Sequence, residues 1–175
     1  MILKGIKNGK LVLRDCILEN KAIIYDERIV DIVEEASCSS MDVEWMDAGG
    51  GYIAPGFIDV HIHGAFGFDV MDEDVNTLRE ISRRLLENGV TAFLPTTITM
   101  PKERIWKALD NIRINMEKPS LGACILGAHL EGPFISPKRK GAHLESEIVK
   151  PDISIIKDYL DMIKIITIAP EVQGG

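Results

Sequence analysis

Two histidines separated by one residue are the first feature of this sequence that could do chemistry. His61 and His63 lie in the stretch 57–63, where apolar and polar side chains alternate. Residues two apart share one face of a strand, so Asp59, His61 and His63 should point to the same side. Two imidazoles about 6–7 Å apart along a strand can share a metal ion. The pattern favours a metal or catalytic site over two histidines hydrogen-bonded inside a core.

A second candidate ligand is Glu131, which ends another largely apolar run. Gly127, His129 and Glu131 share one face of the predicted strand, and this places the carboxylate at the strand end, facing the interior. A buried carboxylate is costly unless it is paired or bound to metal. An ion pair with a lysine or arginine is the alternative, but the two histidines favour metal ligation. His129 lies one layer deeper, either supporting the ligands or filling the core.

The loop after Glu131 carries further candidates for binding. Lys138, Arg139 and Lys140 form a basic triplet that could attract an anionic substrate, although a solvated loop explains them equally well. His143 follows in the same loop, beyond the end of the predicted strand. We therefore interpret His143 as a candidate substrate contact.

These residues need a scaffold that brings them together, and the pattern after residue 51 predicts one. Strands are predicted at 57–63, 90–98, 122–131 and 163–169, and helices at 72–88, 101–117 and 151–162. Such alternation indicates parallel strands joined by helical crossovers. Four units of this kind fit either half a (β/α)₈ barrel or a small open sheet. Because chemistry in a barrel gathers at the carboxyl ends of its strands, the candidate residues should meet at that rim.

The faces of the first of these strands also carry a prediction about packing. Ile58, Val60 and Ile62 alternate with the polar residues, so we expect them on a buried face covered by helices. Residues 1–50 read as short strands and turns, with a hairpin signal at Asn8-Gly9. This segment is too small to bury a sheet alone and must pack against something else.

Composition excludes several classes of protein. The chain has 175 residues with a formal net charge of −7, which argues against a nucleic-acid surface. The longest uncharged run, 88–101, contains prolines and is too short to span a bilayer. The three cysteines are widely spaced and odd in number, so they indicate reduced thiols in a cytoplasmic protein rather than a disulfide framework.

Longer motifs resemble a known family. The stretch Pro55-Gly-Phe-Ile-Asp-Val-His-Ile-His-Gly64 resembles the opening strand of the amidohydrolase superfamily. His129-Leu-Glu-Gly-Pro-Phe134, with Lys140-Gly-Ala-His143 and Ala169-Pro-Glu171, resembles one member family, the N-acetylglucosamine-6-phosphate deacetylases. The likeness runs through nearly the whole chain. The second combination is the more specific one, since many metal hydrolases share the histidine pair.

The resemblance implies an α/β fold, namely a (β/α)₈ TIM-type barrel beside a small β-sandwich built from both chain ends. Residues 1–50 would then be the N-terminal part of the sandwich domain, and residues 51–175 the first four βα units of the barrel. Family members are considerably longer than this chain. The sequence is therefore expected to be the N-terminal half of an enzyme.

The resemblance also implies roles for particular residues. Glu131 would be the principal metal ligand, for a divalent ion that is expected to be zinc. Ala142 and His143 would contact the substrate. His61 and His63 could hold a second ion, because family members that keep this pair can have a two-metal site. Further histidine ligands and the aspartate general base are expected beyond residue 175.

The implied reaction is metal-dependent hydrolysis of the N-acetyl group of N-acetylglucosamine 6-phosphate, giving glucosamine 6-phosphate and acetate in amino-sugar catabolism. In the family one phosphate-binding residue comes from a neighbouring subunit, so a homodimer is expected. Residues 1–175 alone should be inactive. The alternatives are another amidohydrolase, such as a cyclic-amide hydrolase or a deaminase, and a non-catalytic half-barrel.

Overall fold

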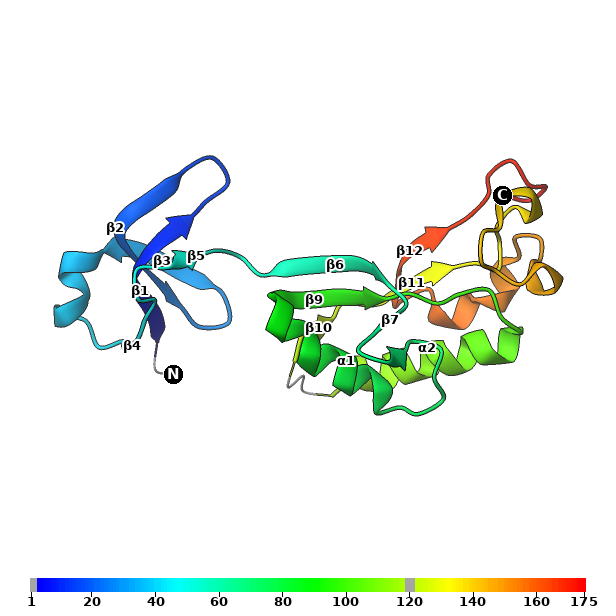
Figure 1. Cartoon of the computed structure of the whole chain (residues 1–175), viewed down its shortest axis with the longest axis horizontal. Helices are drawn as coiled ribbons and strands as arrows, with labels where there is room; N and C mark the ends of the chain where they lie inside the picture. Colours follow the sequence, from blue (N-terminus) through cyan, green and yellow to red (C-terminus); the bar gives the residue numbers. More distant parts are fainter. Residues whose placement is uncertain (1–2, 119–121) are drawn as a thin grey trace. The chain divides into compact units, whose positions relative to one another are not determined.

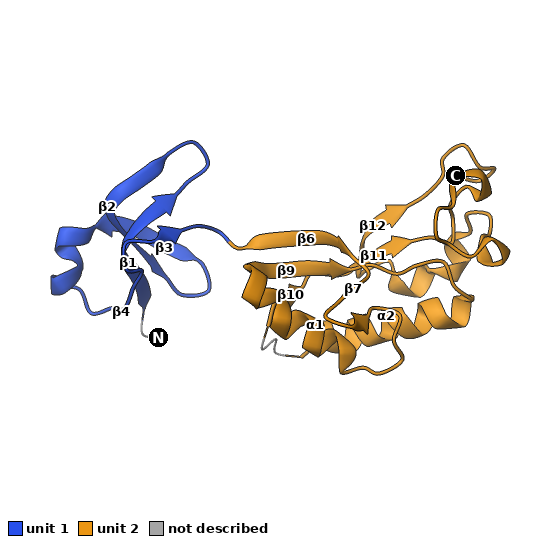
Figure 2. Cartoon of the chain, in the orientation of Figure 1, with its two compact units in different colours: residues 1–55 blue, residues 56–175 orange. Residues whose placement is uncertain are grey.

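The structure is a computed structural model that describes residues 3–118 and 122–175. The chain divides into two compact units, Met1–Pro55 and Gly56–Gly175, which are described separately here (Figure 2). The division follows Pro55, a few residues later than the boundary expected after residue 50.

Unit 1 is one five-stranded sheet, ordered β3-β2-β1-β4, with β5 also paired to β1 (Figure 1). Its strands are β1 (Lys4–Val12), β2 (Ile17–Tyr25), β3 (Ile29–Glu34), β4 (Glu44–Asp47) and β5 (Tyr52–Ile53), and its 3₁₀ helix is η1 (Glu35–Ser40). The β1-β2 and β2-β3 pairs are antiparallel, whereas β4 and β5 run parallel to β1. One sheet in 55 residues buries few side chains fully, among them Leu11 and Ala22.

The hairpin predicted at Asn8-Gly9 is wrong, because β1 continues through both residues. Asn8 has a φ of +53°, and the β1-β2 register shifts on either side of Gly9, so the dipeptide forms a bulge. Asn8 is held in this conformation by its backbone N–H to Glu35 (3.0 Å) and its side chain to Asp47 (2.7 Å). The chain reverses later, where the Leu13 N–H donates to the Cys16 carbonyl.

Unit 2 is built on parallel strands. These are β6 (Phe57–Ile62), β9 (Val90–Pro95), β10 (Cys124–Ile125), β11 (Ala128–Glu131) and β12 (Ile163–Thr167). The β6-β9, β9-β10 and β11-β12 pairs are all parallel, and a Thr96–His129 bridge links the ends of β9 and β11. A small hairpin, β7 (Gly64–Ala65) with β8 (Phe68–Asp69), follows β6. The expected α/β class with parallel strands is confirmed.

Two helices cover one side of these strands, α1 (Thr77–Leu85) and α2 (Lys102–Met116) (Figure 1). Short 3₁₀ turns complete the unit, at Leu86–Asn88, Pro137–Arg139, Glu145–Glu147, Ile153–Ile155 and Lys157–Tyr159. Apolar side chains at helical spacing on both helices enter one core around Phe93 and Leu130. Its helical members are Leu78, Ile81 and Leu85 of α1 and Ile105, Ala108, Leu109 and Ile112 of α2. This core holds the strand ends that carry the site.

The helix predicted at 151–162 does not form; two short 3₁₀ turns occupy this segment. Asp152 caps the first of these turns by accepting a hydrogen bond from the Ser154 N–H (2.9 Å). Trp106 and Arg113 of α2 also donate to carbonyl groups of the segment, those of Ile155 and Asp158, and so take acceptors that a helix would use.

Helix α1 begins at Thr77, not at the predicted residue 72. The Asn111 side chain donates to the Asp72 and Glu73 carbonyls, and Asn115 donates to the Val75 carbonyl. Side chains of α2 thus hold residues 72–75 in an irregular conformation.

The strand predicted at 122–131 is interrupted between β10 and β11. Gly127 has a φ of +149°, and a Cβ there would lie 2.4 Å from the Met162 carbonyl oxygen. Close approach to the segment that enters β12 therefore requires glycine at this point.

The expected burial of the apolar face of β6 is wrong for two of its three residues. Ile58 is 60% exposed and Val60 is 49% exposed, whereas Ile62 packs against the core. The core of this unit reaches Ile62 but does not cover the part of β6 that carries Ile58 and Val60.

None of the helices in the described part of the chain is long and apolar enough to cross a membrane.

Candidate metal centre

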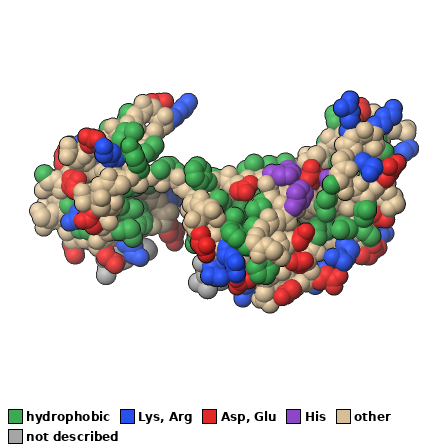
Figure 3. Space-filling view, in the orientation of Figure 1, with side chains coloured by type: hydrophobic (Ala, Val, Ile, Leu, Met, Phe, Trp, Pro, Cys, Tyr) green, Lys and Arg blue, Asp and Glu red, His purple; other side chains and the backbone are tan. Residues whose placement is uncertain are grey.

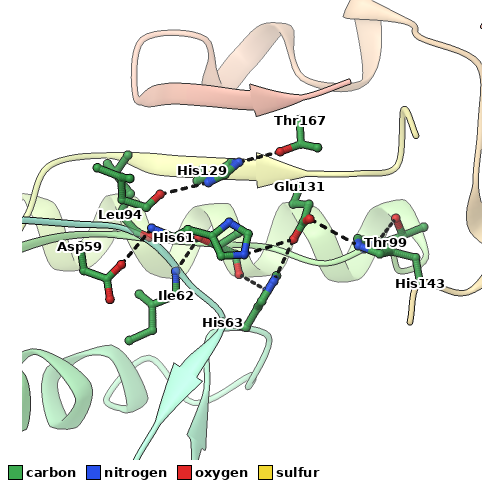
Figure 4. A network of polar contacts seen from close by, with 12 residues as sticks. Asp59, His61, Ile62, His63, Leu94, Thr99, His129, Glu131, His143 and Thr167 are labelled. Carbon is green, nitrogen blue, oxygen red and sulfur yellow. Dashed lines mark hydrogen bonds and ion pairs between the residues drawn. The ribbon is translucent and has the colours of Figure 1, made fainter. Parts of the chain in front are cut away.

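Three side chains from two strand ends converge in unit 2 (Figure 4). His61 and His63 come from the end of β6, and Glu131 is the last residue of β11. The ligand atoms of the three residues all lie within 4.8 Å of one another. Glu131 Oε2 is 2.8 Å from His63 Nε2 and 3.7 Å from His61 Nε2. The structure thus brings together the histidine pair and the carboxylate that the sequence singled out.

The parallel register explains why these residues meet. Thr96, just after β9, ties β6 to β11 because its N–H donates to the Ile62 carbonyl (2.9 Å) and it forms a bridge with His129. Its Oγ1 also accepts from the Ile62 N–H (3.0 Å). The carboxyl ends of β6, β9 and β11 therefore lie at the same edge, where a metal-binding rim was expected.

His63 is oriented by a hydrogen bond to the backbone. Its Nδ1 lies 3.1 Å from the Thr96 carbonyl oxygen, which can only accept, so Nδ1 carries the proton. Nε2 lies 2.8 Å from Glu131 Oε2, so the two atoms form an ion pair when the ring is protonated and offer two lone pairs to a cation when it is neutral. A backbone-held imidazole beside a carboxylate is typical of metal ligands. The donor set of two nitrogens and a carboxylate suits zinc and similar divalent ions.

The cluster is open to solvent on one side. The side chain of His61 is 47% exposed, that of His63 39% and that of Glu131 20%. Figure 3 shows histidine side chains at the surface of unit 2. The two imidazoles meet edge to face, with ring centroids 4.9 Å apart. A substrate could therefore reach a metal held by the three side chains.

His129 lies next to the cluster, but both of its ring nitrogens are used within the protein. Nδ1 donates to the Val60 carbonyl (3.1 Å), and Nε2 accepts from the Thr167 hydroxyl (2.8 Å). Burial lowers the pKa of His129, since desolvation disfavours the charged ring. Its ring packs edge to face on His61, with centroids 5.0 Å apart. His129 therefore ties β6, β11 and β12 together and supports His61, and no nitrogen remains for a metal.

His143 lies on the other side of Glu131. Its Nε2 is 3.8 Å from Glu131 Oε1, while its Nδ1 is held by Thr99 (Figure 4). The side chain is only 10% exposed. Ala142, the other predicted substrate contact, is exposed in the loop beside His143. The two oxygens of Glu131 thus face two different groups, the histidine pair and His143.

The basic triplet is oriented mostly toward solvent. Lys138 and Arg139 are exposed, whereas Lys140 is half-buried, 3.4 Å from the His143 carbonyl oxygen and 3.9 Å from Glu145. Lys140 therefore closes the His143 loop.

Sequence reasoning missed two threonines that position the site, Thr99 and Thr167. Thr167 ends β12, so the rule that strand ends meet at one rim could have found it. Thr99 lies in the loop after β9, and no sequence signal linked it to a histidine 44 residues away.

The fold and the site define an α/β protein with a candidate metal centre at the carboxyl ends of parallel strands. The Amidohydrolase family model matches residues 52–173. The chain therefore belongs to the amidohydrolase family.

Several relatives of known name are similar to nearly the whole of this chain. The chain is 39% identical over 174 residues to N-acetylglucosamine-6-phosphate deacetylase of Bacillus subtilis, covering 95% of this chain and 44% of the relative. The human protein of the same name is 38% identical over 175 residues, covering 95% and 41%. The crystal structure of the Pasteurella multocida deacetylase matches with a TM-score of 0.86 at 29% identity, covering 99% of this chain and 46% of that one. The chain thus spans less than half the length of these relatives.

Proposed function

We propose that the protein is a metal-dependent deacetylase. It would hydrolyse the N-acetyl group of N-acetylglucosamine 6-phosphate to glucosamine 6-phosphate and acetate. The observation that carries the proposal is the position of Glu131, with one oxygen toward His61 and His63 and the other toward His143. A candidate metal cluster and a candidate substrate contact therefore meet at a single carboxylate. The names of the relatives, at 38–39% identity, supply the substrate.

Glu131 would be the principal ligand of a divalent ion, with zinc as the proposed metal, and His61 and His63 would hold a second ion beside it. Such an ion supplies Lewis acidity at an amide carbonyl and makes water a stronger nucleophile. The Thr96 carbonyl holds His63 Nδ1, so Nε2 stays available as a ligand atom. His129 packs on His61 and limits the rotation of that ring.

His143 would contact the sugar, together with the neighbouring Ala142. The His143 ring is largely buried, and its Nε2 faces the space beside Glu131. The general base stays a prediction of the resemblance, expected beyond residue 175. A homodimer and a cytoplasmic location are likewise proposed from the resemblance and the reduced cysteines.

For the fold, we propose that residues 51–175 are the first four βα units of a (β/α)₈ barrel and residues 1–50 the N-terminal part of a small β-sandwich. An apolar hollow of about 340 Å³ in unit 1 supports the sandwich, since a second layer would cover it. Its lining includes Ile6, Leu11 and Ile23. The exposed Ile58 and Val60 of β6 support the barrel for the same reason, since further barrel elements would cover them.

One relative raises a second sugar as a candidate substrate. N-acetylgalactosamine-6-phosphate deacetylase of Escherichia coli O157:H7 is 36% identical over 127 residues. The crystal structure of a D-hydantoinase is only 21% identical to this chain, so that likeness shows the fold alone. Acetate release by the gene-encoded protein with zinc should be measured on both sugar phosphates and on a hydantoin. Faster turnover of the glucosamine derivative is expected, and equal or slower turnover would contradict the proposed substrate.

Replacing both histidines of the pair tests whether they hold a metal. His61→Asn with His63→Asn should lower the bound metal by about one ion per chain if the pair holds a second ion, while some turnover remains. The measurement is metal content by atomic absorption after dialysis. Unchanged stoichiometry would mean that the pair only supports other groups.

His143→Ala should separate substrate contact from metal binding. The side chain lies 3.8 Å from Glu131 and is held by Thr99, so its loss removes a polar contact without removing a candidate ligand. The KM should rise by roughly tenfold or more while metal content stays constant. Loss of metal in this variant would instead make His143 a ligand.

A further inference from the structure

The hydrogen bonds of His143 determine which of its nitrogens carries the proton. The backbone N–H of Thr99 donates to Nδ1 at 3.2 Å, and the Thr99 Oγ1 lies 2.6 Å from the same nitrogen. A backbone N–H can only donate, so Nδ1 must present its lone pair. The hydroxyl therefore also donates to Nδ1, and in the neutral ring the proton lies on Nε2.

Nε2 of His143 has no acceptor within hydrogen-bonding distance in the part of the chain that the structure describes. Its nearest charged neighbour, Glu131 Oε1, lies 3.8 Å away, which is too far for a hydrogen bond. The side chain is nevertheless nine-tenths buried. Its proton is therefore left for water or for a ligand atom that accepts a hydrogen bond beside Glu131.

Thr99 itself has little freedom to move. Its side chain is buried, at 1% exposure. Gly132 approaches so closely that a Cβ there would meet Thr99 Oγ1. The same glycine follows Glu131 directly, so the threonine, the histidine and the carboxylate are packed as one group (Figure 4).

We propose that Thr99 is a positioning residue that holds His143 as the Nε2–H tautomer, so that His143 donates a hydrogen bond to an acceptor oxygen of the substrate beside Glu131. The proposal rests on the proposed function for the identity of that substrate. It adds a chemical requirement: the group recognised by His143 is a carbonyl, hydroxyl or ether oxygen and not a donor such as an ammonium. In N-acetylglucosamine 6-phosphate the acetyl carbonyl and the sugar oxygens meet this requirement.

The tautomer of His143 can be measured directly, without an assay of enzymatic activity. Imidazole ¹⁵N resonances of the gene-encoded protein are recorded by NMR and assigned with His143→Ala. His143 should show a protonated Nε2 and an unprotonated Nδ1. A protonated Nδ1 with an unprotonated Nε2 would overturn the proposal, whether or not the protein deacetylates any sugar.

Two variants of Thr99 test its role in the gene-encoded protein. Thr99→Val keeps the shape and the backbone N–H but removes the hydroxyl, whereas Thr99→Ser keeps both donors. Because valine keeps the backbone donor, the preference for the Nε2–H tautomer should weaken without being lost, so the His143 ¹⁵N shifts should move toward those of the other tautomer. The KM should rise about tenfold, with kcat changed less than about threefold. Serine should retain the wild-type tautomer and restore the KM.

The outcomes distinguish this proposal from the proposed function. If Thr99→Val matches the wild type in both tautomer and KM, Thr99 does not position His143. If valine lowers metal content or kcat as well, and serine fails to restore them, Thr99 is merely structural and the proposal fails. A Thr99-dependent Nε2–H tautomer in a protein that releases no acetate would support the inference and count against the substrate.

Discussion

Glu131→Gln is expected to abolish metal binding and activity together. The substitution keeps the size of the side chain but replaces the carboxylate oxygen that lies 2.8 Å from His63 and 3.7 Å from His61. Loss of groups that merely support ligands costs about 10–100-fold in metal affinity, so loss of a ligand should exceed about 100-fold. Because a divalent ion at this site would supply Lewis acidity at the amide carbonyl, the proposed deacetylation should fall in proportion.

The measurement is zinc affinity by competition with a chromophoric chelator, alongside acetate release. Glu73→Gln is a matched control, since it removes an equal charge from an exposed side chain whose ion pair, to Arg104 at 3.2 Å, lies outside the cluster. The control should bind metal and turn over like the wild type. Full metal occupancy in Glu131→Gln would show that the carboxylate is not a ligand.

Residues 1–175 purified alone should release no acetate from N-acetylglucosamine 6-phosphate, even with added zinc. Within the described residues the candidate cluster holds three ligands, and its one carboxylate is itself a candidate ligand rather than a free base. Metal binding should therefore be weak, and the aspartate general base that the resemblance implies is expected beyond residue 175. The comparison is with the gene-encoded protein under the same assay, where turnover of about 1–10³ per second is typical of enzymes.

The same chain should also associate in solution. Phe57, Ile58 and Val60 of the end strand β6 are 71%, 60% and 49% exposed, and such a strand favours pairing with other chains. Light scattering should report particles larger than 19.4 kDa. A monodisperse monomer with enzyme-like turnover would contradict both the inactivity and the incomplete sheet.

Much of the site was predictable from local patterns. The i, i+2 spacing of His61 and His63 puts them on one face of a strand, and alternation of strands and helices brings strand ends to one rim. Glu131 at the end of a second strand followed from the same rule. The structure places these three residues together because strand periodicity sets the face of each side chain and the parallel strands end at one edge. The α2 stripe of Ile105, Leu109 and Ile112 is predictable for the same reason.

Tertiary structure alone decided the rest. The segment 151–162 has helical spacing, but side chains of α2 take its carbonyl groups, and Asn8-Gly9 became a bulge because Glu35 and Asp47 hold Asn8. Whether Ile58 is buried depends on which distant segments cover β6, and the residues next to Ile58 do not reveal this. The proton position on His143 depends on Thr99, 44 residues away in sequence. Local spacing determined which residues could ligate a metal, whereas long-range hydrogen bonds decided how each ring is oriented.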